Sequence, residues 1–142
     1  MTTAPFVDTN IFIYAYIKPR RKLKPHEVSI KDSAKKTLSR INEGENVSTT
    51  VVHFSELCNI LEDNRPLREA STIEEAILFK ENITIHPVNH EDYLKALHVA
   101  REKDTGINDA IAYTTMEKLG VNKIYSFDKD FDKFNDIKRI TS

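Results

Sequence analysis

Short apolar runs alternate with longer amphipathic segments along the whole chain. Runs of about four residues that are rich in apolar and β-branched side chains are typical of strands buried in a sheet. Such runs occupy residues 4–7, 46–49, 83–86 and 123–126. Residues 137–140 predict a small additional strand at an edge. The pattern therefore predicts a sheet of four or five strands.

The amphipathic segments between these runs predict helices. Ile30, Ala34, Leu38 and Ile41 recur at spacings of four, four and three, which places them on one face of a helix that ends before Gly44. The other predicted helices span residues 11–17, 51–64, about 72–80, 93–100 and 106–119. Helices and strands therefore alternate from one end of the chain to the other.

Strands that are separated by helices long enough to cross over favour a parallel arrangement. We therefore predict an α/β fold, a three-layer sandwich with a central, mostly parallel sheet flanked by helices, formed by residues 1–142 as a single domain. In such sheets ligands bind outside the carboxyl ends of the strands. The residues that follow each predicted strand are therefore the first candidates for a functional site.

Composition narrows the possible functions only slightly. The formal net charge of the 142 residues is −1, so the overall charge does not indicate a nucleic-acid-binding protein. Only local clusters of basic residues could attract a nucleic acid. The single cysteine, Cys58, excludes a disulfide framework and is expected to be a small buried hydrophobe. No segment reaches the ~20 apolar residues of a membrane span, and no targeting signal is evident. We expect a soluble, cytoplasmic protein without a membrane partner.

A basic cluster follows the first predicted helix. Five of the seven residues 18–24 are Lys or Arg, and neighbouring prolines disfavour a helix, which predicts a surface loop. Such a run is either a solvated face or a contact for phosphate groups. Its candidate phosphate contacts are Arg20, Arg21, Lys22 and Lys24. Just upstream, Tyr14 and Tyr16 are expected to fill the core instead.

Four acidic residues occupy distinctive positions. Asp8 follows the first predicted strand and Asp128 the fourth, so both are expected at the carboxyl edge of the sheet. Asp109 and Glu56 lie in predicted helices among apolar neighbours, and both are expected to point toward packed surface. For Asp109, an acid that offsets the helix dipole in the first turn is a purely structural alternative. Burying the Glu56 carboxylate requires a counter-charge, either His53 or a bound cation.

The stretch SFDKDFD near the end of the chain places three aspartates at alternate positions, Asp128, Asp130 and Asp132. Calcium-binding EF-hand loops show this alternation, but they require Gly at position 6 and Glu at position 12. Lys133 and Arg139 occupy those positions, which excludes an EF-hand. Asp128 is expected to be a corner of the site, Asp130 an auxiliary residue and Asp132 a solvated turn residue.

Four motifs together resemble the acidic signature of the PIN-domain ribonucleases. They lie in the family's order along nearly the whole chain, at residues 7–10 (VDTN), 48–57 (STTVVHFSEL), 108–112 (NDAIA) and 126–131 (SFDKDF). The likeness is greatest to the VapC toxin group and to related stand-alone archaeal proteins. Residues 66–80 match no motif of the family. Each motif alone is weakly specific, but four in the right order are a specific signal.

The resemblance implies a set of site residues. The catalytic and metal-binding acids would be Asp8, Glu56, Asp109 and Asp128. Asn10 and Ser126 would give polar support around them. In the last motif Asp128 would be the site member, whereas Asp130 would lie near the site or have a structural role. Clustered carboxylates repel one another unless a divalent ion compensates their charge. Oxygen ligands favour Mg²⁺, with Mn²⁺ as a substitute, whereas zinc draws His or Cys.

The resemblance thus implies a Mg²⁺- or Mn²⁺-dependent ribonuclease that hydrolyses phosphodiester bonds of single-stranded RNA and leaves a 5′-phosphate and a 3′-hydroxyl. The basic cluster would then contact RNA. The VapC likeness further implies a toxin with a cognate antitoxin, and a homodimer. The alternative is a PIN-fold module that binds RNA or protein without significant nuclease activity. No P-loop, dinucleotide-binding glycine fingerprint or nucleophile elbow supports another enzyme class.

Overall fold

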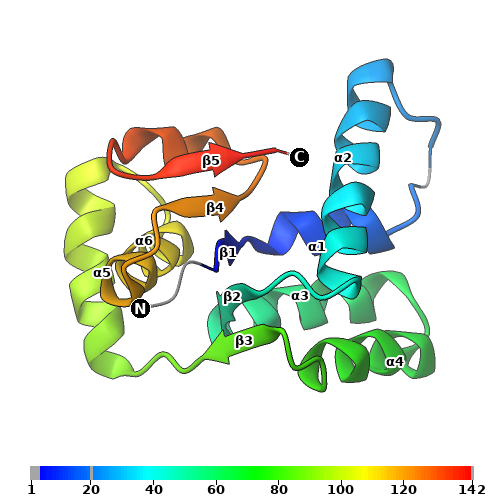
Figure 1. The fold of residues 1–142 in the computed structure, drawn as a ribbon, viewed down its shortest axis with the longest axis horizontal. Helices are drawn as coiled ribbons and strands as arrows, with labels where there is room; N and C mark the ends of the chain where they lie inside the picture. Colours follow the sequence, from blue (N-terminus) through cyan, green and yellow to red (C-terminus); the bar gives the residue numbers. More distant parts are fainter. Residues whose placement is uncertain (1–3, 20, 142) are drawn as a thin grey trace.

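A five-stranded parallel sheet forms the centre of the computed structural model, which describes residues 4–19 and 21–141 (Figure 1). The strand order is β3-β2-β1-β4-β5, and every neighbouring pair is parallel. The strands are β1 (Phe6–Val7), β2 (Val47–Thr50), β3 (Ile83–His86), β4 (Lys123–Tyr125) and β5 (Lys138–Ile140). The predicted parallel sheet is confirmed, with the additional edge strand as its fifth member.

In the described part of the chain, six α-helices and one short 3₁₀ helix connect the strands. They are α1 (Thr9–Tyr16), α2 (Pro25–Asn42), α3 (Val51–Asn64), α4 (Leu67–Leu78), α5 (His90–Lys103), α6 (Ile107–Leu119) and η1 (Lys129–Lys133). Among the described residues, no helix is long and apolar enough to cross a membrane. The three-layer α/β sandwich is confirmed.

Alternate residues of the strands face opposite layers of helices. Val7 packs in a cluster with side chains of α1 to α4, whereas its neighbour Phe6 packs in a second cluster with residues of α6 and η1. Both are fully buried, because β1 lies between β2 and β4 and has helices on both faces. The short central strand is thus covered on both sides.

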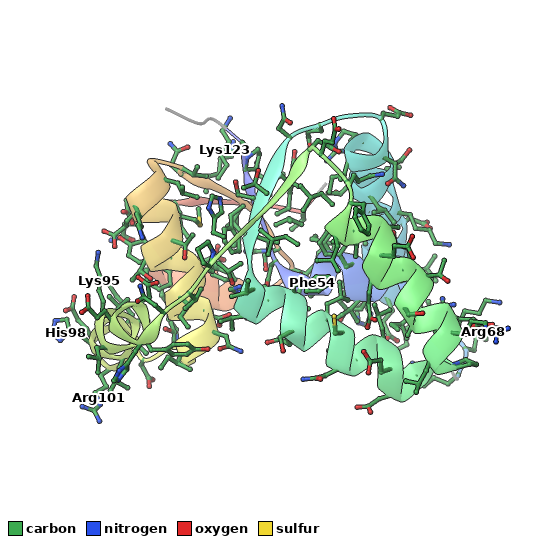
Figure 2. The ribbon with its side chains drawn as sticks, turned by 90° about the horizontal axis from the view of Figure 1, so that it is seen from below. Phe54, Arg68, Lys95, His98, Arg101 and Lys123 are labelled. Atoms are coloured by element: carbon green, nitrogen blue, oxygen red, sulfur yellow. The ribbon has the colours of Figure 1, made fainter. Side chains whose placement is uncertain are left out.

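The solvent-facing side of α5 carries both polar and apolar side chains, because Leu94 and Leu97 are 57% and 38% exposed. Lys95, His98 and Arg101 project from it away from the rest of the molecule (Figure 2). On the other side of the sheet, Phe54 of α3 packs against the core instead. Helix periodicity predicted the covered side of α2 correctly, because Ala34 and Ile41 are buried and Ile30 and Leu38 are partly buried.

Two predictions about local structure are wrong. Helix α4 begins at Leu67 rather than near residue 72. Pro66 directly precedes it, and Leu67, Arg68 and Glu69 are all exposed, so the start of the helix shows no apolar face with helical spacing. Tyr14 does not fill the core, since its side chain is 40% exposed on α1 and meets Phe127 edge to face. Tyr16 is partly buried, as expected.

The start of α3 is fixed by a buried polar pair at the end of β2. The Thr50 hydroxyl accepts the His53 backbone N–H at 3.3 Å, which caps the helix, and it lies 2.7 Å from His53 Nδ1. Both residues are buried. One hydroxyl therefore satisfies two buried groups.

Replacing Thr50 tests this contact. Thr50→Val keeps the shape but leaves the His53 ring nitrogen and the helix N-terminus without a partner, so we expect a loss of about 1–3 kcal/mol in the free energy of unfolding. Thr50→Ser keeps the hydroxyl and should lose no more than about 1 kcal/mol. Urea unfolding of both variants measures the difference, and equal stability of the two would contradict the assigned role of the hydroxyl.

Candidate active site

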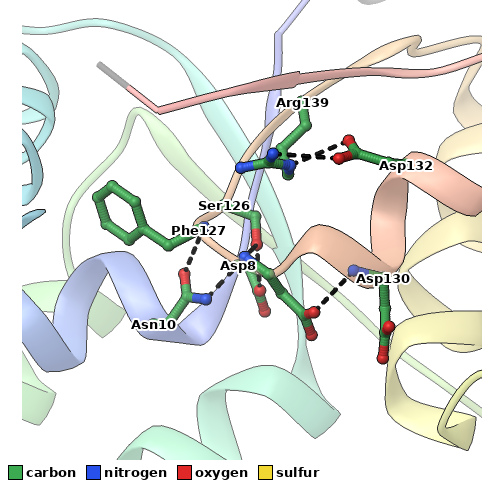
Figure 3. Close-up of polar contacts among 8 residues, drawn as sticks. Asp8, Asn10, Ser126, Phe127, Asp130, Asp132 and Arg139 are labelled. Carbon is green, nitrogen blue, oxygen red and sulfur yellow. Dashed lines mark hydrogen bonds and ion pairs between the residues drawn. The ribbon is translucent and has the colours of Figure 1, made fainter.

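Asp8 and Ser126 lie side by side at the carboxyl edge of the sheet. They follow β1 and β4, which pair in register, and the Asp8 N–H donates to the Tyr125 carbonyl at 3.0 Å. The Ser126 hydroxyl donates to Asp8 Oδ2 at 2.7 Å, and the side chains are seen together in Figure 3. Residues 118 positions apart are therefore joined at one point.

Asp8 is almost completely buried, which makes the ionised form of its carboxyl unfavourable. Burial raises the pKa of its carboxyl to about 6, although hydrogen bonds from Ser126 and from the Thr9 N–H at 2.8 Å act in the opposite direction. The nearby acids Glu56 and Asp128 raise this pKa further. Both carboxylate oxygens of Asp8 are thus held in place in a setting that favours a cation.

Ser126 and Asn10 hold the loop that follows β4. Ser126 Oγ accepts the Asp128 N–H at 3.0 Å and lies 3.5 Å from Asn10 Nδ2. The Asn10 side-chain oxygen accepts the Phe127 N–H at 3.4 Å (Figure 3). These contacts place both residues at the site of Asp8, where the resemblance to the PIN-domain ribonucleases implied polar support.

Asp109, Asp128 and Asp130 converge beside Asp8. Each offers a carboxylate oxygen, and these oxygens lie within 4.8 Å of one another. Asp128 Oδ1 also accepts the Asp130 N–H at 2.9 Å, which caps η1. The side chain of Asp130 is about half exposed, and Lys133 Nζ lies 3.6 Å from it. The structure thus places Asp130, the auxiliary residue of the sequence prediction, in one carboxylate cluster with Asp109 and Asp128.

Within this cluster, the ionised form of Asp109 is clearly disfavoured. Burial raises the pKa of its carboxyl to about 7, and repulsion by Asp128 and Asp8 acts in the same direction. It lies in the first turn of α6, so the helix dipole offsets only part of this cost. A structural role at the helix start alone does not explain why further carboxylates surround it.

Glu56 reaches the site from α3 and is held by Asn108. The Asn108 side-chain amide donates to Glu56 Oε2 at 3.0 Å and so links α3 to the first turn of α6. The predicted alternative of a His53 partner is wrong, because that ring contacts Thr50 and burial lowers its pKa to about 4, which keeps it neutral. Sequence reasoning missed Asn108, although its place directly before Asp109 is a usable signal.

Glu56 and Asp109 are less buried than predicted. Both are partly exposed, and Glu56 lines an open groove instead of pointing into packed surface. Because water reaches these carboxylates, the cost of keeping them charged is lower than full burial would impose. The opening also means that a ligand can reach them.

The basic cluster and Asp132 lie outside this arrangement of contacts. Arg21 forms a two-pronged ion pair with Glu27, at 2.7 and 2.9 Å, while Lys22 and Lys24 are exposed. Arg20 lies outside the described residues. Asp132 is exposed, as predicted for a solvated residue, but Arg139 donates two hydrogen bonds to it and lowers its pKa (Figure 3).

Comparison with known proteins identifies the family. The model of the PIN domain family matches residues 6–137. The chain belongs to the PIN-domain family. Nucleases of this family generally use divalent metal ions, and a donor set made only of carboxylate oxygens fits a hard cation. No curated protein sequence matches the chain.

Solved structures share the fold of this PIN domain. One is the Mycobacterium tuberculosis toxin VapC20, which cleaves the sarcin-ricin loop, with a TM-score of 0.68 and 20% identity over 91% of this chain and 93% of that chain. Another is a toxin-antitoxin complex from Klebsiella pneumoniae, with a TM-score of 0.67 and 13% identity over 98% of both chains. At these identities the likeness shows the fold, and it covers nearly the whole chain.

The raised pKa values predict how stability of the metal-free PIN domain depends on pH. The pKa values of Asp8 and Asp109 rise from 3.8 to about 6 and about 7, so the unfolded chain releases these protons at lower pH than the folded chain does. Stability should therefore fall as pH rises from about 4 to about 7. Asp109→Asn should weaken this fall, whereas Asp32→Asn, at an exposed position of α2, should not. Urea unfolding midpoints, measured in the presence of a chelator between about pH 4 and 7, test this prediction. A wild-type midpoint that does not change with pH would contradict the raised pKa values of Asp8 and Asp109.

Proposed function

We propose that this PIN domain is a Mg²⁺-dependent ribonuclease, with Mn²⁺ as a substitute, that hydrolyses phosphodiester bonds of single-stranded RNA. The observation that carries the proposal is the convergence of Asp109, Asp128 and Asp130 beside the buried Asp8 at the carboxyl edge of the sheet. Membership of the family supports nuclease activity. An acidic edge of this kind is suited to hold a cation and, through it, a phosphate.

Asp8, Asp109 and Asp128 would hold the ion, with Glu56 and Asp130 beside them. A bound divalent ion would lower the pKa of a water molecule and neutralise charge on the phosphate. Asp128 and Glu56 are each fixed through one carboxylate oxygen, by the Asp130 N–H and by Asn108 respectively. The other oxygen of each therefore has a defined direction and can bind the ion or accept a proton from the attacking water.

Asp8 differs because both of its oxygens accept hydrogen bonds. The Thr9 N–H and the Ser126 hydroxyl set its orientation, and each oxygen keeps a second lone pair for a cation. Removing the serine hydroxyl would leave the carboxylate in place but free to rotate. Ser126 therefore has the role of a positioning residue in this proposal.

Substitution of Asp8 and Ser126 tests the activity. Wild-type protein with Mg²⁺ should cut unstructured RNA and leave 5′-phosphate ends, and excess chelator should stop it. Asp8→Asn should lower the rate by about 100-fold or more, and Ser126→Ala by roughly 10- to 100-fold. Asp32→Asn is the matched control and should cut at the wild-type rate. Equal cutting with and without chelator would refute the metal mechanism, and binding without cutting would favour a PIN-fold binding module.

We also propose that a cognate antitoxin protein binds this chain. A toxin-antitoxin complex among the structures of the same fold supports this partner. A cavity of about 420 Å³ between α1 and α2 offers a place, since Ile13, Ile17 and Leu23 line it. Tyr14 also lines it and touches Phe127, which lies between Ser126 and Asp128. A partner bound there would therefore lie close to the acidic edge.

A homodimer is the remaining part of the proposal. Leu94 and Leu97 of α5 are 57% and 38% exposed, which supports an apolar contact with a second copy. Light scattering should give twice the monomer mass of 16.4 kDa. A monomer mass at all concentrations up to about 100 µM would contradict the proposal, because Kd values of stable dimers lie well below this.

A further inference from the structure

An open groove of about 460 Å³ lies between α3 and the start of α5, beside the acidic edge. Ser55, Glu56 and Asn59 line it from α3, Tyr93 from α5 and Asn108 from α6, together with three valines. The groove has the volume of a small-ligand site and opens to solvent. Its size suits one nucleotide rather than a folded partner.

The groove and the proposed catalytic site share two residues. Glu56 and Asn108 line the groove, and their 3.0 Å hydrogen bond fixes the carboxylate that faces it. Glu56 also acts electrostatically on Asp8. A nucleotide whose phosphate lies at the acidic edge would therefore have its base within reach of the groove.

The chemistry of the lining fits a base and not a phosphate. Of the described residues that line the groove, none is Lys or Arg, and Glu56 would repel a phosphate. The side chains of Ser55 and Asn59 make no hydrogen bond within the described part of the chain, and both are exposed. Tyr93 is 36% exposed and offers an aromatic ring. Aromatic rings and neutral amides are the groups that recognise unstacked RNA bases.

Two other cavities among the described residues lack this combination. The cavity between α1 and α2 carries Arg21, Glu27 and Lys31 and shares no acid with the site. A smaller cavity beside His86 carries Lys95 and Lys118 and is equally separate. Of these three cavities among the described residues, only the α3–α5 groove shares a carboxylate with the proposed site.

We propose that the α3–α5 groove binds one unstacked base of single-stranded RNA next to the bond that is cut, with Tyr93 stacked on the base and Asn59 hydrogen-bonded to its edge. This inference rests on the proposed ribonuclease function. It assigns sequence preference to α3 and α5, and leaves bond cleavage to the acids.

Binding measured without cleavage separates this proposal from the activity itself. In the Asp8→Asn background with Mg²⁺, Tyr93→Ala should raise the Kd for a short unstructured RNA by roughly 5- to 100-fold, whereas Tyr93→Phe should leave it within about twofold. Phe79→Ala removes an aromatic ring that is 79% exposed elsewhere, at the end of α4, and is the matched control. An unchanged Kd in Tyr93→Ala would overturn the proposal even if the wild-type protein cuts RNA.

Cut-site choice provides the second measurement. Asn59→Ala in the otherwise wild-type protein should change which base flanks the cut in a random single-stranded RNA pool, while Phe79→Ala should not. The same flanking base in wild type and Asn59→Ala would overturn the assigned reading by Asn59. Light scattering of Tyr93→Ala gives a third outcome: conversion of a dimer to a monomer would show that a second copy fills the groove, and would also overturn the proposal.

Discussion

The buried hydrogen bond from Ser126 Oγ to Asp8 Oδ2 joins the two ends of the chain at the carboxyl edge of the sheet. It can form because β1 and β4 are paired in register, although β1 contains only two residues. The same hydroxyl accepts the Asp128 N–H, so one serine orients Asp8 and anchors the loop that carries the next acids. Any shift of β1 relative to β4 would separate the acidic residues. The geometry of the site therefore depends on the shortest strand of the sheet.

This acidic edge is unfavourable for the folded chain on its own. Burial raises the pKa values of Asp8 and Asp109, and the hydrogen bonds that Asp8 receives only partly offset this cost. The core on both faces of the sheet supplies the compensating stability, since Phe6, Val7 and Ile124 are fully buried beneath the site. A cation bound at the edge would return part of the lost free energy, because binding to the folded state alone stabilises it. In the proposed function, the same clustered carboxylates both destabilise the metal-free folded chain and give it affinity for a metal ion.

The fold was predictable because its signals are local. Four-residue apolar runs and one-sided helices follow directly from the sequence, and the acids that follow strands must meet at one edge of a parallel sheet. The place of Asn108 before Asp109 marks it as a candidate, but its hydrogen bond to Glu56 was not predictable, since that bond joins two helices whose relative rotation is set by packing. The exposure of Tyr14 was missed for a similar reason. A run of apolar residues in the sequence predicts a buried helix, but it does not show which of its side chains a neighbouring helix leaves uncovered. The start of α4 was missed because its first three residues are exposed and form no apolar face.

The charge distribution constrains how this chain could hold RNA. The acidic edge repels phosphates, the net charge is −1, and Arg21 of the basic cluster is already paired with Glu27. Attraction between the whole protein and a polyanion is therefore weak, so a cation and contacts to the bases would have to supply the affinity. The α3–α5 groove suits this requirement, because Glu56 is its one charged residue among the described lining and its amide, hydroxyl and aromatic groups can bind a base without attracting the backbone. On this argument, weak general attraction for RNA favours selective cutting over general degradation.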